Sequence, residues 1–362
     1  MNFKKILEGI GLVLVILVIG LAGFLWLGVY HPAEVEEMAV TCPDSAPQVQ
    51  PGQSLKVLTW NVQTMSGKNY VFWSDLPTND GPDDQPSPED ITLTLEEVAR
   101  AIIDENPDII LIQEIDNGAA RTYNEDQLAR LLDLLPDEYA CSTSTFSWKA
   151  AYVPHPRIKG SVGWMEAIVS KYQISTADRH RLVISESSWL ETQFRIKPAI
   201  LASHLPMVGG GEFVAATLHF DIYVPGNNAK DLQVEQVNQF LANLNASGTP
   251  WVLGGDFNLL PYDDAAYNRL LPSHQPSYNS VSEIKPLFDA YLAVPSQEEV
   301  TGENYAAWLT RWPNDPAISG PDRTLDYIFL PPSIALGDHY VRQADTLVIS
   351  DHLPVVAVFE LP

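Results

Sequence analysis

Six short segments of this chain end in side chains that can hold a divalent metal or move a proton. They are LTWNVQ with Asn61, IILIQE with Glu114, ATLHFD with His219, VLGGDFN with Asp256 and Asn258, TLDYIF with Asp326, and SDH with Asp351 and His352. Apolar runs of about 4 to 8 residues that break into carboxylates, amides and imidazoles are typical of strand ends that converge on one polar site. The pattern predicts a metal-dependent hydrolase.

The metal ligands are expected among the oxygen-bearing side chains. Glu114 follows the apolar run Ile109 to Ile112, which places its carboxylate at the edge of a hydrophobic strand. Hard cations such as Mg²⁺, or Mn²⁺ in its place, take oxygen ligands with water completing the shell. Asn61, Glu114 and Asp351 are the predicted set, and their combination matters because a single strand-end glutamate is usually a surface acid.

The remaining side chains are suited to proton transfer and phosphate binding. Asp256 and Asn258 lie two residues apart after two glycines, so both face the same way if the segment is extended, and the glycines allow a ligand close to the backbone. An Asx-type turn fits this segment nearly as well. Asp326 is expected to fix the tautomer of His352. His219 follows an apolar strand, where a lone histidine is more often a core or rim residue.

In order and spacing, these segments resemble the endonuclease/exonuclease/phosphatase superfamily from about Leu55 to Leu361. The matching sequences are TWNVQ, ILIQE, GWMEAIVSK, ATLHFD, LGGDFN, RTLDYIF and SDHLPV. The resemblance implies metal-dependent phosphoester hydrolysis. Gln63 stands where apurinic endonucleases have an aspartate, and together with His219 it favours the deoxyribonuclease I-like and neutral sphingomyelinase-like branch.

The resemblance also implies a role for each residue. Asn61, Glu114 and Asp351 correspond to the metal side, and His219 to the imidazole that contacts the scissile phosphate. Asp256 corresponds to the acid that orients water, Asn258 to the phosphate-binding amide, and Asp326 to the acid paired with His352. His352 is then the general base or a phosphate-stabilising imidazole, and the choice between Asp256 and His352 as proton acceptor stays open.

The elements that must position these residues read as a single α/β domain. Short strands are expected at Leu55 to Val62, Asp108 to Glu114 and Trp251 to Gly255, and a capping box at Thr94 and Glu97 predicts a helix start. Many strands with few helices indicate a four-layer sandwich, in which two mainly antiparallel sheets pack face to face with helices outside.

A membrane anchor is expected to precede this domain. The stretch from Gly9 to Tyr30 is uncharged and long enough to cross about 30 Å of hydrocarbon. Lys4 and Lys5 before it and acids after it predict a cytoplasmic N-terminus and an extracytoplasmic domain. A cleaved signal peptide is the alternative, and both export the domain. The expected division is residues 1–30 as a single-pass transmembrane helix, 31–53 as a linker and 54–362 as the catalytic domain.

The net charge of the chain narrows the class of substrate that we expect. With 21 basic and 46 acidic residues, the net charge is −25, which suits long DNA poorly because nucleic-acid binding needs a basic surface. The predicted function is a membrane-anchored Mg²⁺-dependent phosphodiesterase acting on a phospholipid headgroup, as sphingomyelinases do. The aromatic residues Tyr70, Phe72 and Trp73 either enter the lipid interface or pack on the domain.

Several alternatives remain open at the level of sequence. An exported endonuclease could bind phosphates through a local rim of basic residues, namely Arg157, Lys159, Lys171, Arg179 and Arg181. A non-catalytic binding domain on the same fold is the third reading. Cys42 and Cys141 form either a disulfide, which an oxidising exterior would permit, or two free thiols. The oligomeric state is not indicated.

Overall fold

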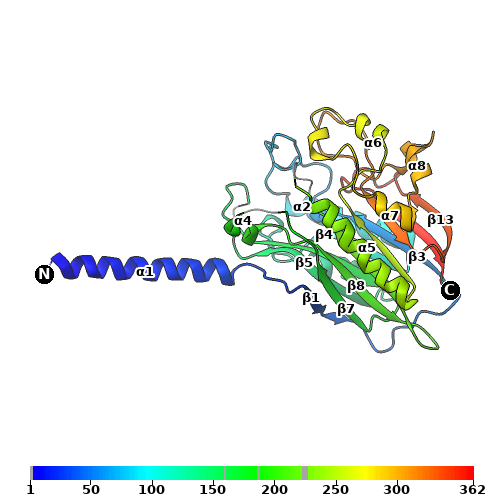
Figure 1. The fold of residues 1–362 in the computed structure, drawn as a ribbon, viewed down its shortest axis with the longest axis horizontal. Coiled ribbons are helices and arrows are strands. Elements are labelled where there is room, and N and C mark those ends of the chain that lie inside the picture. Colours follow the sequence, from blue (N-terminus) through cyan, green and yellow to red (C-terminus); the bar gives the residue numbers. More distant parts are fainter. Residues whose placement is uncertain (1–2, 159, 186–187, 222–226) are drawn as a thin grey trace.

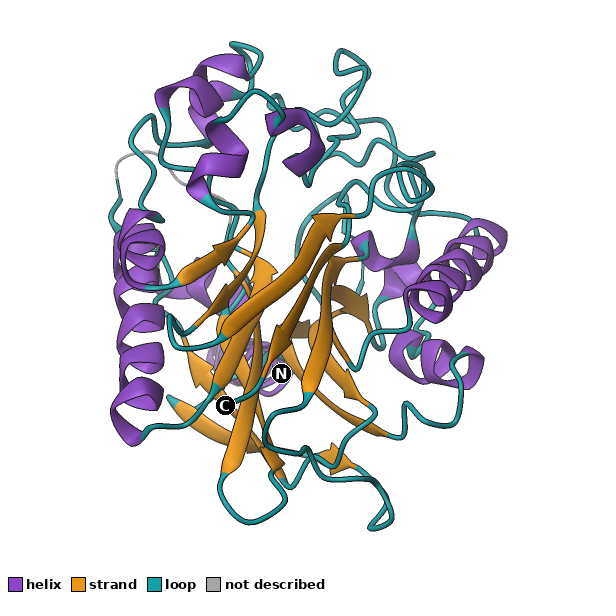
Figure 2. Ribbon diagram, turned by 90° about the vertical axis from the view of Figure 1, so that its right-hand side faces the viewer, coloured by secondary structure: helices purple, strands orange, loops and turns teal. Residues whose placement is uncertain are grey.

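A computed structural model describes residues 3–158, 160–185, 188–221 and 227–362 (Figure 1). Two mixed sheets of seven strands each pack face to face, and helices cover their outer faces (Figure 2). The predicted four-layer α/β sandwich is therefore confirmed. Strands β3 and β4 are parallel, as are β9 and β10, and the other strand pairs are antiparallel.

We name the two sheets after the site residues they carry. In hydrogen-bonding order, the His219 sheet contains β1 (Val35–Met38), β7 (Thr176–Arg181), β8 (Ala199–Pro206), β9 (Glu212–His219), β10 (Trp251–Asp256), β12 (Asp326–Leu330) and β11 (Leu292–Val294). The Glu114 sheet contains β13 (Ala335–Val341), β14 (Val355–Glu360), β3 (Ser54–Asn61), β4 (Ile109–Asp116), β6 (Val162–Ser170), β5 (Cys141–Ala150) and β2 (Val40–Thr41).

Most of the helices belong to the outer layers, and the first of them stands apart from the sandwich (Figure 1). The helices are α1 (Phe3–Leu27), α2 (Pro88–Glu105), α3 (Gln127–Leu134), α4 (Trp189–Phe194), α5 (Ala229–Ser247), α6 (Asp264–Arg269), α7 (Lys285–Ala290) and α8 (Gln297–Thr301). Helices α2 and α3 pack on the Glu114 sheet, and α5 and α7 pack on the His219 sheet. A separate apolar cluster joins the two sheets, for example Val57 and Leu111 on one side with Val252 on the other. Both faces of the central strands are thus buried, which explains their continuous apolar sequences.

The start of α2 differs from the sequence prediction. Ser87 is the N-cap, and its hydroxyl accepts the N–H of Asp90 at 3.1 Å, while Pro88 occupies the first turn. The prediction of a start at Thr94 is wrong, because proline is preorganised for the first helical position and Ser87 caps it. Thr94 instead lies buried within the helix.

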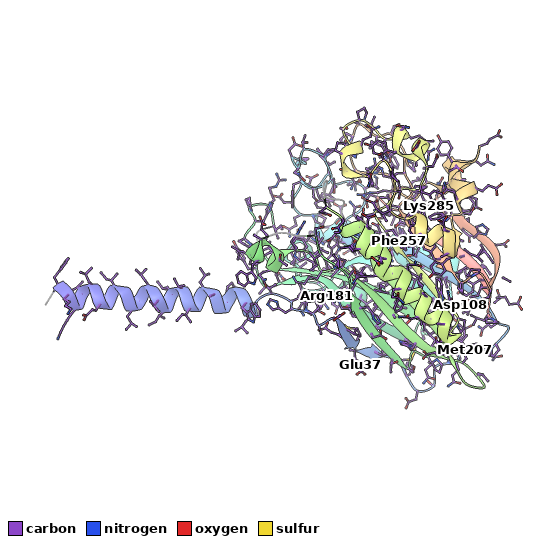
Figure 3. All side chains as sticks on the ribbon, in the orientation of Figure 1. Glu37, Asp108, Arg181, Met207, Phe257 and Lys285 are labelled. Atoms are coloured by element: carbon purple, nitrogen blue, oxygen red, sulfur yellow. A yellow bond between two sulfur atoms is a disulfide. The ribbon has the colours of Figure 1, made fainter. Side chains whose placement is uncertain are left out.

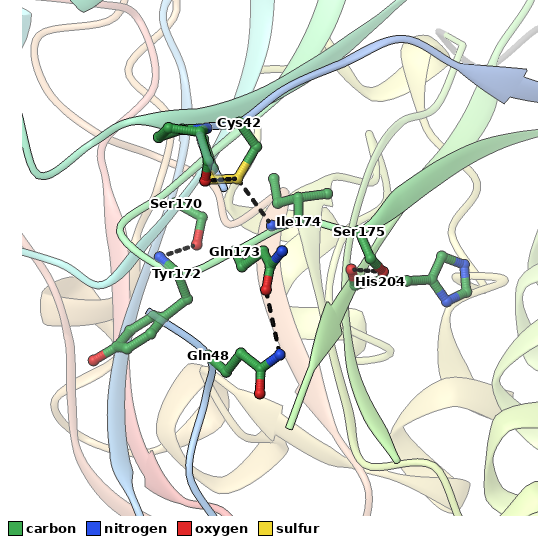
Figure 4. Close-up of a disulfide and its surroundings, with 10 residues drawn as sticks. Cys42, Gln48, Ser170, Tyr172, Gln173, Ile174, Ser175 and His204 are labelled. Atoms are coloured by element: carbon green, nitrogen blue, oxygen red, sulfur yellow. Dashed lines mark hydrogen bonds between the residues drawn. A yellow bond between two sulfur atoms is a disulfide. The ribbon is translucent and has the colours of Figure 1, made fainter. Parts of the chain in front are cut away.

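Residues 31–53, expected to be a linker, contribute the edge strand β1 to one sheet and β2 to the other. A disulfide joins Cys42 to Cys141, and the Cys42 sulfur accepts the N–H of Ile174 at 3.4 Å (Figure 4). Pairing by β1 and β2 satisfies backbone groups that β7 and β5 would otherwise expose at the sheet edges. The sequence does not reveal these strands, because strands of four and two residues are too short to show an alternation of apolar and polar residues.

Helix α1 projects away from the domain, and its side chains have no partner along most of its length (Figure 3). Residues Phe3–Phe24 have a mean hydropathy of 2.6 and are long and apolar enough to cross a membrane, a property that a signal sequence shares. Just beyond the helix, Val29 packs against Ala150, Val153 and Val162. The chain is therefore anchored to the domain directly where the apolar helix ends.

Candidate active site

The predicted site residues come from both sheets and meet at one end of the sandwich. Asn61 ends β3, and Glu114 lies at an irregularity in the neighbouring β4. His219 and Asp256 end the parallel pair β9 and β10 and are register partners. Asp326 begins the antiparallel β12 opposite Asp256. Because parallel strands end at the same edge, the topology gathers these side chains in one place.

His352 is held by Asp326. The Nδ1 of His352 lies 2.8 Å from Asp326 Oδ2, and both side chains are buried. Thr310 supports the pair, since its hydroxyl donates to Asp326 Oδ2 at 2.6 Å. These contacts fix the imidazole so that Nε2 faces Asp256, whose Oδ2 is 3.5 Å away. The carboxylate–imidazole pair expected from the sequence is present in the structure.

A second imidazole approaches the same carboxylate. His219 Nε2 lies 3.4 Å from Asp256 Oδ2 and 3.2 Å from the Nδ2 of Asn258. The Asn258 side chain also donates to the carbonyl of Phe220 at 2.9 Å, and its backbone N–H donates to Asp256 Oδ1 at 2.8 Å. The last bond is the Asx-type turn considered from the sequence. It coexists with a site role, because the turn itself orients Asn258 toward His219.

Asn61 connects Glu114 to Asp256. Its Nδ2 donates to Glu114 Oε1 at 2.8 Å and to Asp256 Oδ2 at 3.1 Å, whereas its Oδ1 accepts the backbone N–H of Gln63 at 3.0 Å. A backbone N–H can only donate, so this contact determines which way the amide faces. Asn61 thus positions two carboxylates in this arrangement, and its predicted role as a direct metal ligand remains a prediction.

Asp351 lies beside an arginine that the sequence did not indicate. Its Oδ2 is 3.2 Å from Arg311 Nη2, and its backbone N–H donates to Gln63 Oε1 at 3.3 Å. Burial by itself would lower the pKa of Arg311, but Asp351 together with the nearby groups Asp256, Glu114 and Tyr278 outweighs burial and raises that pKa. Arg311 is therefore a permanent positive charge beside the predicted metal side of the site.

The donor set fits a divalent cation. Among the described residues, two groups have ligand atoms within 4.8 Å of one another: Glu114, His219 and Asp256, and then Asp256, Asp326 and His352. Burial raises the pKa of Glu114 to about 8, and the charge of Asp351 adds to the effect. A buried carboxyl with this shift lacks a compensating positive charge, which a bound cation would supply.

The remaining pKa shifts distinguish the charged proton-transfer groups from the neutral one. Burial alone would lower the pKa of His352, but Asp326 and Asp256 outweigh it and raise it to about 9. Burial lowers the pKa of His219 to about 4, with Asp256 opposing the shift. Burial acts to raise the pKa of Asp256, yet His352 and His219 reverse this and leave it below its usual range. The site therefore contains one charged imidazole, one neutral imidazole and an ionised carboxylate between them.

The backbone around the site is unusual. Glu114 and Asn258 both have positive φ, at 57° and 50°, as does Gln63 at 46°. Non-glycine residues in this region cost about 1–3 kcal/mol each and persist where the surroundings enforce them. The two glycines of GGDFN have a packing reason instead. A Cβ on Gly255 would lie 2.1 Å from the carbonyl oxygen of Leu218, so the close approach is between strands and not to a ligand.

Sequence reasoning missed Thr310, Arg311 and the site role of Gln63. Gln63 is buried beside Asn61 and Asp351, and its Nε2 has no partner among the described residues. Thr310 and Arg311 precede the TLDYIF segment by a loop, and no apolar run leads to them. Their contacts to Asp326 and Asp351 arise only when separate segments fold together.

The proposed basic rim does not form a shared surface. Arg179 is buried and donates to the carbonyl of Lys197, and Arg157 is bound to Asp84 and to the carbonyl of Gly81. Lys171 pairs with Glu138 at 2.7 Å. Arg181 is exposed (Figure 3), and Lys159 lies outside the described residues. Arg157 and Lys171 are thus paired with acids and Arg179 is buried, so these three side chains do not supply the free positive charges that a phosphate backbone requires.

The aromatic residues of the first long loop pack within the protein. Tyr70 and Phe72 stack with ring centroids 5.9 Å apart, and Trp73 stacks on His155 at 4.6 Å. Tyr70 also donates to Asp90 and accepts the N–H of Ser87 at 2.8 Å, which ties the loop to the start of α2. All three side chains are half-buried, so packing on the domain accounts for them.

Comparison with known proteins agrees with this fold. The Endonuclease/Exonuclease/phosphatase family model matches residues 58–352. An endonuclease/exonuclease/phosphatase from Beutenbergia cavernae DSM 12333 is 22% identical, with a TM-score of 0.56 over 85% of this chain and 72% of that chain. One from Bacteroides vulgatus is 14% identical, with a TM-score of 0.51 over 86% and 100%. A family protein from Leptotrichia buccalis C-1013-b is 16% identical, with a TM-score of 0.51 over 85% and 100%.

At these identities, the solved structures show the shared fold alone. No curated protein matches the sequence significantly. The assignment of this chain therefore depends on the family match and on the geometry of its own site.

Proposed function

This chain belongs to the Endonuclease/Exonuclease/phosphatase family, and we propose that it is a membrane-anchored, metal-dependent phosphodiesterase. In this proposal, it hydrolyses the P–O bond of a phospholipid headgroup outside the cytoplasm. The deoxyribonuclease I-like and neutral sphingomyelinase-like branch is part of the same proposal. The observation that supports it most is the convergence of Glu114, His219, Asn258 and the Asp326–His352 pair around Asp256.

The side chains suggest a division of labour. Asp256 accepts hydrogen bonds from Asn61 and from the Asn258 backbone, which stabilises its carboxylate form, so it is the better acceptor for a proton from water. His352 has Nδ1 committed to Asp326, so its Nε2 can donate to a phosphoryl oxygen. Removal of one such donor typically costs about 10²- to 10³-fold in rate.

Water would attack phosphorus in line with the leaving alcohol. The new bond joins the water oxygen to phosphorus, and the proton lost by the water passes to Asp256. The bond to the alcohol oxygen breaks with its electron pair on that oxygen, which takes up a proton from solvent as the alcohol departs. Glu114 and Asp351, with Asn61 beside them, are the residues proposed to hold Mg²⁺ or Mn²⁺. The chemistry that such a cation supplies when bound is polarisation of the phosphoryl group and stabilisation of the leaving oxygen.

Three features support a location at a membrane outside the cytoplasm. Helix α1 is apolar and unpartnered, and the Cys42–Cys141 disulfide suits an oxidising compartment. Helix α4 lies beside the base of α1, because Phe194 packs with the cluster around Val29 and its carbonyl accepts the Trp148 indole N–H at 2.7 Å. On α4, Trp189 is 68% exposed and Leu190 is 53% exposed, as residues at a lipid interface are.

The test is hydrolysis of bis(p-nitrophenyl) phosphate by the full chain in detergent, with Mg²⁺ and then with EDTA. We expect turnover with the metal and none with the chelator. Glu114→Gln should reduce turnover about 10³-fold or more, whereas Glu97→Gln, on the exposed face of α2, should behave as the wild type. Metal-independent turnover, or equal activity of Glu114→Gln, would reject this site.

A parallel assay separates the classes of substrate. Phospholipid vesicles and plasmid DNA are given to the same preparation, and headgroup release with intact plasmid is the expected result. Nicked plasmid with untouched lipid would make the protein an exported nuclease. Absence of turnover on every phosphoester would favour the non-catalytic alternative.

A further inference from the structure

A pocket of about 230 Å³ lies beside the catalytic residues and shares Asn258 with them. Two segments that are distant in the sequence form its walls, residues 74–79 of the first long loop and residues 274–278, together with Arg311 and Arg323. We call it the Arg311 pocket. Its volume is below the roughly 300–1,000 Å³ typical of pockets for drug-sized ligands, so it is suited to one ring-sized group.

One wall of the Arg311 pocket consists of rigidly held donors. Arg323 is 3% exposed, and it binds Asp322 through Nε at 2.6 Å and Nη2 at 2.7 Å. Its Nη1 donates to Tyr278 Oη at 3.2 Å. Arg311 is bound to Asp351 only through Nη2, and its Nε is buried with no partner in the described part of the chain. Arg311 therefore retains donor capacity where the pocket meets the catalytic site.

The opposite wall offers acceptors and hydroxyl groups. Asp75 uses one carboxylate oxygen, Oδ2, to accept the Phe72 N–H at 2.9 Å and the Asn314 amide at 3.3 Å. No hydrogen bond from the described residues reaches its Oδ1. The side chains of Ser74, Asn79 and Ser277 also line the pocket without such a bond in the described structure. Both donors and acceptors are thus available to one ligand.

This mixture of hydrogen-bond donors and acceptors excludes two charged ligand groups, a quaternary ammonium and a second phosphate. A quaternary ammonium such as choline needs a cage of aromatic faces and no competing cations, but this pocket contains two guanidinium groups, and its aromatic rings are Tyr278 and the imidazole of His274, which is held by Asp315. A second phosphate needs unpaired positive charge, yet Arg323 and Arg311 are paired with Asp322 and Asp351. Asp75 would also repel it. A neutral group that both donates and accepts hydrogen bonds is repelled neither by the guanidinium groups nor by Asp75.

We infer that the Arg311 pocket binds a neutral polyhydroxylated alcohol esterified to the scissile phosphate, with Asp75 and Arg311 as specificity-determining residues. The inference rests on the proposed phosphodiesterase function and refines its substrate class. Asp75 accepts from hydroxyl groups of the alcohol, and Arg311 donates to them. Asn258 holds the adjoining phosphoryl group. The long first loop thus has a function, as loops of its length usually do.

The first experiment compares two soluble phosphodiesters that share a p-nitrophenyl group and differ only in the other alcohol, p-nitrophenyl phosphoinositol and p-nitrophenyl phosphocholine. The full chain with Mg²⁺ is expected to hydrolyse the inositol compound with a kcat/KM about 10- to 100-fold higher, mainly through a lower KM. Equal values, or preference for the choline compound, would overturn the inference. In either case, turnover of bis(p-nitrophenyl) phosphate would leave the proposed function standing.

Two variants test the acceptor and hydroxyl side chains of the Arg311 pocket. Asp75→Asn and Ser277→Ala should each move the ratio of the two kcat/KM values toward one. Ser277→Ala removes a hydroxyl that has no partner among the described residues, so it should fold as the wild type does. The matched control is Asp80→Asn in the same loop, since the Asp80 side chain accepts a hydrogen bond from Thr78 and is not among the residues that line the pocket. An unchanged ratio in both pocket variants would contradict the assignment.

Binding provides a readout that does not depend on turnover. Glu114→Gln with Mg²⁺ should bind p-nitrophenyl phosphoinositol more tightly than p-nitrophenyl phosphocholine by calorimetry, and equal binding would count against the pocket even in an inactive protein. Vesicles of phosphatidylinositol and phosphatidylcholine identify the source of the ligand. Preference on vesicles as well as in solution indicates a lipid headgroup, and preference in solution alone indicates a free phosphodiester. Loss of the preference in both settings would overturn the inference.

Discussion

Asp256 shows how single residues in this protein depend on distant ones. Its two oxygens accept hydrogen bonds from Asn61 on the facing sheet and from Asn258 in its own turn, and both imidazoles approach it. Burial of a carboxylate without such partners would carry a large desolvation free energy. The charge distribution of the site is therefore collective, and changing any one member alters the others.

Asn258 allows a sharp prediction. Asn258→Ala removes an amide donor next to His219 and Asp256, and kcat for bis(p-nitrophenyl) phosphate should fall about 10²-fold while KM changes less. Asn243→Ala on the exposed face of α5 is the control. Thermal unfolding should show that both variants fold. A kcat within twofold of the wild type would remove Asn258 from the mechanism.

The pair of His204 on β8 and Asp178 on β7 predicts a pH dependence of stability. His204 Nε2 lies 2.6 Å from Asp178 Oδ1 and its Nδ1 lies 3.2 Å from Glu212, while His180 binds the other Asp178 oxygen. The hydrogen bond to Asp178 raises the pKa of His204. Its stabilisation is therefore complete below the unfolded pKa of about 6.5 and is lost as pH rises through the folded pKa.

Urea unfolding of the wild type and of His204→Gln, compared between about pH 5.5 and 9, checks this. The difference in unfolding free energy should be largest at the acid end and shrink as pH rises. Circular dichroism is a sufficient signal. A difference that is constant with pH would show that the pKa of His204 is the same in the folded and the unfolded protein.

At the scale of elements, short edge strands complete the two sheets. Strand β1 pairs with β7 and strand β2 pairs with β5, and both belong to the segment that leads out of α1. The disulfide at Cys42 fastens this segment to β5. A domain that began at Ser54 would lose both edges together, so the tether and the sandwich are structurally linked.

Cys42→Ser tests that link. The residues joined are 99 apart, and a loop of this length predicts a loss of roughly 2–5 kcal/mol on removal of the bond. Denaturant unfolding under non-reducing conditions measures it. Ser247→Ala, at the exposed end of α5, is a control that should cost well under 1 kcal/mol. A loss no larger than that of the control would mean that pairing alone holds the segment.

Helix α4 gives a prediction about lipid contact. Replacing Trp189 and Leu190 together by alanine should lower hydrolysis of vesicle phospholipid about 10-fold and leave a soluble phosphodiester unaffected, because these side chains are exposed on α4 and are not among the residues assigned to the site. Leu93→Ala on α2, where the side chain is 58% exposed, controls for loss of exposed apolar area. Equal loss on both substrates would indicate a folding defect and not a membrane contact.

At the scale of the whole molecule, the apolar helix α1 and the net charge of −25 both favour attachment to a membrane through the helix and not through the surface of the domain. The acidic domain gains nothing from anionic surfaces, so its position at a membrane would depend on α1 and on the few apolar side chains near it. Substrate access is then governed by tethering more than by long-range attraction.

Cell fractionation tests the tether. The full chain should remain with membranes after a carbonate wash, and protease added outside intact cells should digest the domain. Release of a shortened, soluble domain would establish the cleaved signal peptide. Protection from external protease would reverse the proposed orientation.

The sequence by itself determined the fold class and most of the site. Asn61, Glu114, His219, Asp256 and Asp326 were recognisable because each ends or begins an apolar strand, and that pattern is local. Two facing sheets with helices outside then followed from the many strands and the few, separated helices. The start of α2 at Ser87 was within reach of the same reasoning, since a serine followed by proline is a local capping signal.

Only the tertiary structure decided which side chains complete the site. Arg311, Thr310 and Asp75 lie in loops with no periodic pattern, and their partners are distant in the chain. The same holds for the pairing of residues 31–53 and for the bond between Cys42 and Cys141. Contacts between distant segments depend on how the two sheets and their loops pack in space, and residue order alone does not encode that packing in any local signal.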